Sequence, residues 1–94
     1  MDVKNMELTV LGSELAKMAR TELKTLCDNL CVRDLHKVIM AMNIEFDTQS
    51  ESFMDKKNRS AGLRSRKVTA SMQTVFLAWR KKTIAATNDF NLVG

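Results

Sequence analysis

The segment 68–88 places its apolar residues at the spacing of an α-helix. Val68, Met72, Val75, Phe76 and Trp79 stand at positions i, i+4, i+7, i+8 and i+11, and so share one helix face. The chain has no proline that would interrupt such a helix, and it has only three glycines. Strand-rich folds of this size use more glycine in their hairpin turns. The sequence therefore predicts an all-α fold with this stripe in its core.

The length of 94 residues is that of a single domain, 1–94, with one small core. Hydrophobic residues make up 45% of the chain and charged residues 28%, which favours a globular rather than a disordered chain. The start, MDVKNMELTV, has an acidic residue at position 2 and no long apolar run, so it does not resemble a signal peptide. The longest uncharged stretch, 68–79, is too short to span a bilayer. We expect a cytoplasmic protein with no membrane contact.

Helical periodicity and breaks in it predict six helices. The pattern fails between Glu45 and Lys67, where apolar residues are scattered among polar ones, and we see no internal repeat. Thr21 and Asp34 are the expected caps of the second and third helices, and Asn43 is the expected stop of the third. The expected spans are 5–19, 21–32, 34–43, a short helix within 49–58, 65–83 after a basic loop, and a last helix from Asp89.

Cys27 and Cys31 stand four residues apart on the second expected helix. A disulfide there would close almost no loop, so we interpret both as reduced, buried thiols of a cytosolic protein. His36 is the only histidine and there is no tyrosine, and the cysteines and His36 match no zinc spacing. Isolated glycines cannot form a phosphate loop. We therefore expect no enzymatic activity, no metal and no cofactor.

Charge is divided unevenly along the chain. Residues 1–50 contain six basic and eight acidic residues, a net charge of −2, whereas residues 51–94 contain nine basic and three acidic residues, a net charge of +6. Such polarity suits a partner with a complementary face, including a second copy.

The basic residues within 56–67 leave an alternative open, a small helical nucleic-acid-binding domain. Each of these cations could contact a phosphate, and binding would then depend steeply on salt. No aromatic residue lies among them to stack on bases, so we rank nucleic acid below protein as a partner. A purely structural bundle within a larger protein is a third interpretation. The basic residues of the loop are Lys56, Lys57, Arg59, Arg64, Arg66 and Lys67.

Three segments resemble the death-domain family. The run LAKMARTELKTLCDNLCV, residues 15–32, has Leu15, Ala16, Met18, Leu23, Leu26 and Leu30 at the apolar positions of the family's first two helices. The segment RDLHKVIMAMN resembles the third helix of the family. The run MQTVFLAWRKKTIAATNDFNLV, residues 72–93, is similar to the family's last helices, with Trp79, Ala86 and Thr87 in register and Phe90 at an apolar place.

The resemblance implies an antiparallel six-helix Greek-key bundle of the death fold, with a short last helix. It also implies an adaptor that binds another death-fold domain, or itself, in apoptotic or innate-immune signal transduction. Charged residues would form the interface, and Trp79 would be a core anchor. The candidate interface residues are Glu22, Asp28, Arg33, Asp34, Lys37, Arg59, Arg64, Arg66, Lys67, Arg80, Lys81 and Lys82.

Overall fold

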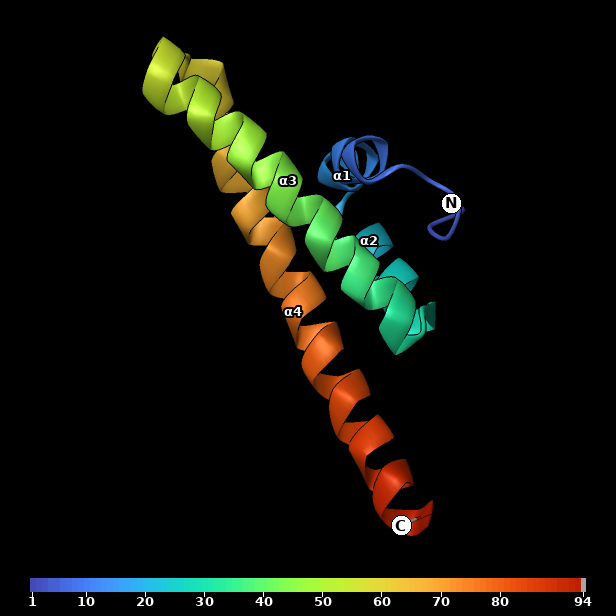
Figure 1. Ribbon diagram of the computed structural model, residues 1–94. Coiled ribbons are helices and arrows are strands. Elements are labelled where there is room, and N and C mark those ends of the chain that lie inside the picture. The colour runs from blue at the N-terminus through green and yellow to red at the C-terminus, as the bar shows by residue number, and fades with distance from the viewer. Residues whose placement is uncertain (94) are drawn as a thin grey trace.

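The computed structural model describes the backbone of residues 1–93 and the side chains of residues 1–89. The chain folds into four α-helices, not six, so the predicted six-helix Greek-key bundle is wrong, although the all-α class is confirmed (Figure 1). The helices are α1 (Leu8–Lys17), α2 (Arg20–Asn29), α3 (Val32–Lys56) and α4 (Arg59–Val93). Within residues 1–93, none of them combines the length and the apolar composition that crossing a membrane requires.

The two long helices, α3 and α4, form an antiparallel hairpin that determines the shape of the molecule (Figure 1). The Arg64 Nε donates to Gln49 Oε1 at 2.8 Å near the turn. Further along, the rings of His36 and Trp79 lie 6.3 Å apart, centre to centre. The molecule measures 52 × 22 × 22 Å. An α-helix rises about 1.5 Å per residue, so α4 alone accounts for the long dimension.

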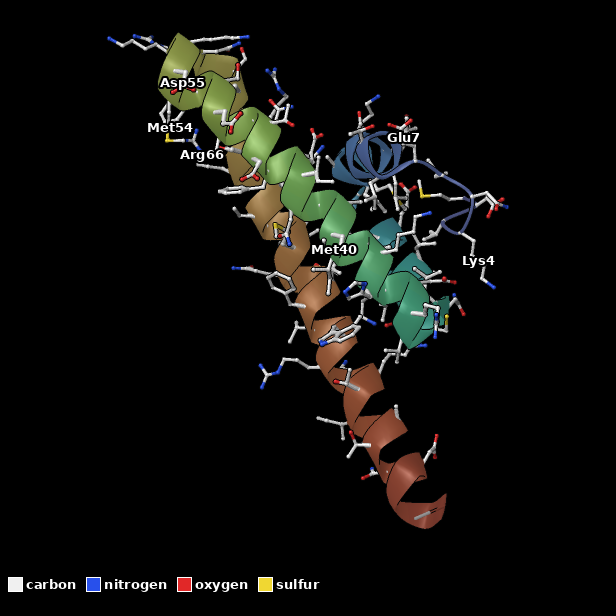
Figure 2. All side chains as sticks on the ribbon, viewed as in Figure 1. Lys4, Glu7, Met40, Met54, Asp55 and Arg66 are labelled. Atoms are coloured by element: carbon white, nitrogen blue, oxygen red, sulfur yellow. The ribbon has the colours of Figure 1, made fainter. Side chains whose placement is uncertain are left out.

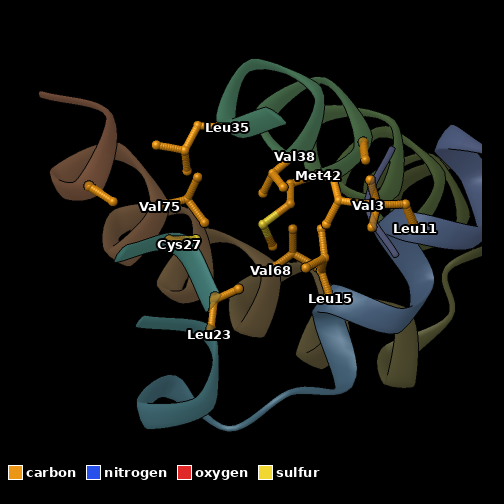
Figure 3. Packing of buried hydrophobic residues seen from close by; sticks show 12 residues of the cluster. Val3, Leu11, Leu15, Leu23, Cys27, Leu35, Val38, Met42, Val68 and Val75 are labelled. Carbon is orange, nitrogen blue, oxygen red and sulfur yellow. The ribbon is translucent and has the colours of Figure 1, made fainter. Parts of the chain in front are cut away.

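The short helices α1 and α2 cover one side of this hairpin. Helix α1 packs mainly on α3 and helix α2 on α4. Their buried leucines meet the apolar stripes of both long helices in one core (Figure 3). The core consists of Val3, Leu11, Leu15, Leu23, Cys27, Leu35, Val38, Ala41, Met42, Val68, Val75 and Ala78.

The predicted stop at Asn43 is not used, and the third and fourth expected helices are one helix, α3. Asn43 is an exposed residue within α3. An asparagine inside a helix costs less than about 1 kcal/mol relative to alanine. The apolar face continues past it, because Phe46 packs against the core. With no glycine or proline nearby, packing against α4 overrides the weak stop signal.

The prediction of a basic loop before the long helix is also wrong, because the structure has a two-residue turn there. Helix α3 ends at Lys56, and the next residue, Lys57, adopts left-handed backbone angles (φ 54°, ψ 36°). The Asn58 Oδ1 then accepts a hydrogen bond from the backbone N–H of Ala61 at 3.2 Å, which caps the start of α4. Four of the six cations of the expected loop, Arg59, Arg64, Arg66 and Lys67, therefore lie on helix α4.

The break expected at Ala86-Thr87 does not occur either. Both residues lie within α4, and the Thr87 Oγ1 donates to the backbone oxygen of Thr83 at 2.8 Å. Alanine is the best helix former and threonine satisfies its hydroxyl on the preceding turn, so neither residue stops the helix. The expected apolar role of Phe90 lies outside the described side chains.

Three smaller expectations also change. Cys31 is exposed between α2 and α3, so only Cys27 is the buried thiol that was predicted. Trp79 is half-buried and packs against the core from its edge, while Phe76, from the same expected stripe, is exposed. Thr21 is inside α2, and the chain enters that helix at Ala19.

Candidate protein interface

The twelve charged residues predicted as an interface do not form a single site. They lie on α2 (Glu22, Asp28), in the first turns of α3 (Arg33, Asp34, Lys37) and along α4 (Arg59, Arg64, Arg66, Lys67, Arg80, Lys81, Lys82). Asp34, Lys37 and Lys82 are half-buried and the other nine are exposed. The elongated shape separates the cations near the turn from those further along α4.

The structure does bring Asp28 together with lysines of α4. The Lys82 Nζ donates to the backbone oxygen of Asp28 at 2.7 Å, and the Lys24 Nζ donates to Asp28 Oδ2 at 2.8 Å. The hydrogen bond from Lys24 lowers the pKa of the Asp28 carboxyl, and the charges of Lys24, Lys81 and Lys82 act in the same direction. Lys82 thus satisfies a carbonyl at the end of α2 and ties that helix to α4.

Two other predicted interface cations also have partners inside the fold. The Lys37 Nζ donates to the backbone oxygen of Lys4 at 2.8 Å, and Arg64 is held by Gln49. Within residues 1–89 the salt bridges are Glu14–Lys17 and Lys24–Asp28, both between exposed side chains. Arg66, Lys67, Arg80 and Lys81 form neither a salt bridge nor a side-chain hydrogen bond in that part of the chain.

Beside these four cations, α4 exposes a regular apolar stripe. Leu63, Ala70, Leu77 and Ile84 follow one another at intervals of seven residues, and the three larger side chains are 61%, 56% and 63% exposed. This spacing places them along one line on the helix. Since the buried Val75 points toward the core, the stripe lies on the side of α4 that faces away from α3. We call these four residues the outer stripe.

The outer stripe belongs to a short sequence repeat, although no internal repeat was expected. The pattern L-x-x-R-K-x-T occurs at 63–69 and again at 77–83. An interval of 14 residues is close to four helical turns, so each leucine and its Arg-Lys pair recur on the same side of α4. This segment has two series of apolar residues, one that is buried in the core and one that is exposed on the surface. The buried series is the more regular in the sequence, and the exposed series was therefore overlooked.

The outer side of α3 has the opposite charge. Asp47, Glu51 and Asp55 are exposed and stand at i, i+4 and i+8, so they form one line on the helix. Gln49 and Phe53, which contact α4, point to the other side. No cation pairs with the three carboxylates within residues 1–89. We call these three residues the acidic edge; the side chains of Met54 and Asp55 lie near the hairpin turn (Figure 2).

Two further concave surfaces contain few side chains that could act in catalysis or bind a metal ion. A recess between α1 and the hairpin is lined by Lys17, Glu45, Gln49 and Arg64, and a shallow groove near Trp79 is lined by His36 and Cys31. Among residues 1–89, no three His, Cys, Asp or Glu side chains converge to hold a metal ion. Burial, together with the charge of Asp28, raises the pKa of the Cys27 thiol from 9.0 to about 11.

Comparison of the chain with protein-family models, curated proteins and solved structures gives no match.

Proposed function

We propose that this protein is a non-enzymatic protein–protein interaction module that binds acidic surfaces of its partners through α4. The observation that supports this most directly is the outer stripe together with Arg66, Lys67, Arg80 and Lys81. The three larger apolar side chains and the four cations are exposed, and the cations have no partner within residues 1–89. A line of apolar side chains flanked by unpaired cations suits an amphipathic partner with acidic flanks.

Both components of this surface favour a protein partner. Burying one exposed leucine contributes on the order of 1.5–3 kcal/mol. An exposed ion pair contributes less, on the order of 0.2–1 kcal/mol, and salt screens it. The apolar residues would then supply most of the affinity, and the cations would select the partner and speed the encounter.

The resemblance to death domains predicts the narrower function, homotypic association with another death-fold domain or itself in apoptotic or innate-immune assemblies. Because the expected six-helix bundle is not found, this narrower proposal rests on the residue pattern alone. A cytoplasmic adaptor that recruits its partner through charged faces remains compatible with the unpaired cations of α4.

The test is capture of partner proteins from a cell extract with the full chain as bait. We expect specific partners to bind at about 0.1 M salt and to bind more weakly at about 0.5 M salt, because salt screens the attraction between the cations and the acidic groups of the partner. Replacing Arg66, Lys67, Arg80 and Lys81 with glutamine should weaken capture markedly, with an unchanged circular dichroism spectrum.

The matched control removes four positive charges outside residues 66–81, by replacing Lys4, Lys56, Lys57 and Arg59 with glutamine. It should capture the same proteins as the wild type. If both quadruple variants capture equally well, α4 is not the binding surface and the proposal fails.

Nucleic acid is the alternative partner for the cations near the hairpin turn. Lys56, Arg59 and Arg64 are exposed there, but Glu51 and Asp55 of the acidic edge lie beside Lys56 and Arg64. These carboxylates would repel a phosphate backbone, which disfavours the alternative. A gel-shift assay with mixed-sequence duplex and single strands at about 50 mM salt tests it, and no shift would remove it.

A further inference from the structure

The C-terminal part of α4 extends beyond the helix on which it packs. Trp79 lies beside His36, near the start of α3, and the two helices are antiparallel. Counting back from this pair, Val32, the first residue of α3, lies beside Thr83. The residues of α4 after Thr83 therefore have no neighbour on α3, and Ile84 is 63% exposed. An isolated helical segment of this length is marginal in water, so a packing partner would stabilise it.

The outer surface of α4 that leads into this projecting end consists of four residues, of which only Ile84 lies beyond Thr83. Leu77 and Ile84 of the outer stripe are separated by two turns, and Arg80 and Lys81 lie between them. The two apolar side chains are about 10 Å apart along the helix axis, given a rise of about 1.5 Å per residue. We call Leu77, Arg80, Lys81 and Ile84 the tail face.

A complementary surface exists nearer the hairpin turn of the same molecule. The three carboxylates of the acidic edge extend over about 12 Å of α3, a length similar to that of the tail face. Met54 is 63% exposed beside them, and Ile44, one turn before Asp47, is half-buried. The acidic edge thus combines negative charge with apolar side chains, whereas the tail face combines positive charge with apolar side chains.

We propose that the tail face of one copy docks along the acidic edge of α3 in a second copy. Arg80 and Lys81 then lie among Asp47, Glu51 and Asp55, while Leu77 and Ile84 cover Ile44 and Met54. This inference rests on the proposed function, because it names a second copy of this chain as the acidic partner. The two surfaces differ and lie on different helices, the acidic edge near the hairpin turn and the tail face further along α4 (Figure 1), so every docked copy leaves one surface of each kind free. Such a heterologous contact builds an open row of copies rather than a closed dimer.

Pairing of like surfaces is disfavoured by charge. Two tail faces would bring Arg80 and Lys81 against the same cations of the other copy, and two acidic edges would bring carboxylates together. Like charges placed opposite one another across an interface suppress that contact.

Sedimentation velocity and light scattering on the purified full chain test the proposal. The average mass of the wild type should rise with protein concentration beyond that of a dimer, and it should fall as salt is added. The tail variant R80E/K81E and the edge variant D47K/E51K should each associate at least about tenfold more weakly, because attraction becomes repulsion.

The decisive sample is an equimolar mixture of the two variants. The tail variant keeps an acidic edge that can receive the unchanged tail of the edge variant, and its reversed tail is complementary to the reversed edge. The mixture should therefore regain the association that each variant lacks alone. The control K4E/R20E makes the same change in net charge as the tail variant, away from both surfaces, and should associate like the wild type.

A wild type that stays monomeric at every concentration, or a mixture that stays monomeric, would overturn the inference. A control variant that associates as weakly as the tail variant would also overturn the inference. If the monomeric wild type still captures other proteins through α4, the proposed function stands and only self-association fails. If capture is lost as well, both proposals fail.

Discussion

Gly12 determines how closely α1 approaches α3. A Cβ atom at this position would collide with the backbone oxygen of Ala41 and would lie 3.3 Å from the Cβ of Glu45. The obstacle is mainly the backbone of another helix, which cannot move without shifting the core. Glycine is therefore required here by packing, although it is a poor helix former.

We predict that Gly12→Ala lowers the free energy of unfolding by about 1–2 kcal/mol. The expected overpacking cost of about 1–3 kcal/mol exceeds the gain in helix propensity of up to about 1 kcal/mol. Urea denaturation measures the change. Gly62→Ala is the matched control, because its Cβ would meet only the ring of exposed Phe53, which can move. A Gly12→Ala variant as stable as Gly62→Ala would contradict this explanation.

The two cysteines differ in burial and should differ in reactivity. Cys27 is buried with the pKa of its thiol raised to about 11, so at pH 8 it stays protonated, whereas Cys31 is exposed. Because the thiolate is the nucleophile, we predict that an aromatic disulfide reagent modifies one thiol per native chain rapidly. Cys27 should react only after unfolding in guanidinium. Cys31→Ser should remove the rapid phase, and two rapid thiols per chain would show that Cys27 is accessible.

At the scale of elements, the turn between α3 and α4 decides whether the long helices form a hairpin. Lys57 adopts a left-handed conformation (φ 54°) that disfavours residues with a Cβ, and Asn58 caps the helix that follows. The free energy of this turn therefore depends on the conformation of two residues rather than on contacts between side chains.

We predict that Lys57→Gly raises the free energy of unfolding by about 0.5–1 kcal/mol, because glycine adopts the left-handed conformation without a steric cost. Asn58→Ala should lower it by about 1 kcal/mol through loss of the cap. Thermal and urea denaturation measure both changes. Lys57→Ala is the control that removes the lysine without relieving the backbone; if it stabilises as much as glycine, the charge and not the backbone is responsible.

At the scale of the whole molecule, the hairpin of α3 and α4 places the acidic and basic parts of the sequence on separate surfaces. The antiparallel arrangement exposes the carboxylates of α3 on one side and the cations of α4 on the other. Arg80 and Lys81 lie on α4 beside the first turns of α3, whereas Glu51 and Asp55 lie near the hairpin turn. The two surfaces are therefore too far apart to neutralise one another within a chain, and this separation motivates the proposed contact between copies.

The sequence by itself determined the all-α class, the helical stripes of Leu11, Leu15, Val68 and Val75, and the division of charge. These properties depend on residue spacing and composition, which are local. It also contained the repeat of the outer stripe, because spacing at seven residues can be read without a structure, but a surface stripe cannot be told from a core stripe until burial is known.

Only the tertiary structure decided how many helices form. Asn43 is a weak stop signal whose small local cost is exceeded by the packing of α3 against α4, and Ala86-Thr87 does not break a helix locally, so six expected helices became four. The tertiary structure also decided which cations form hydrogen bonds within the fold. Lys37, Arg64 and Lys82 bond within the fold, while Arg66, Lys67, Arg80 and Lys81 form no salt bridge or side-chain hydrogen bond within residues 1–89. Neighbouring residues in the sequence receive different partners because each points to a different side of its helix.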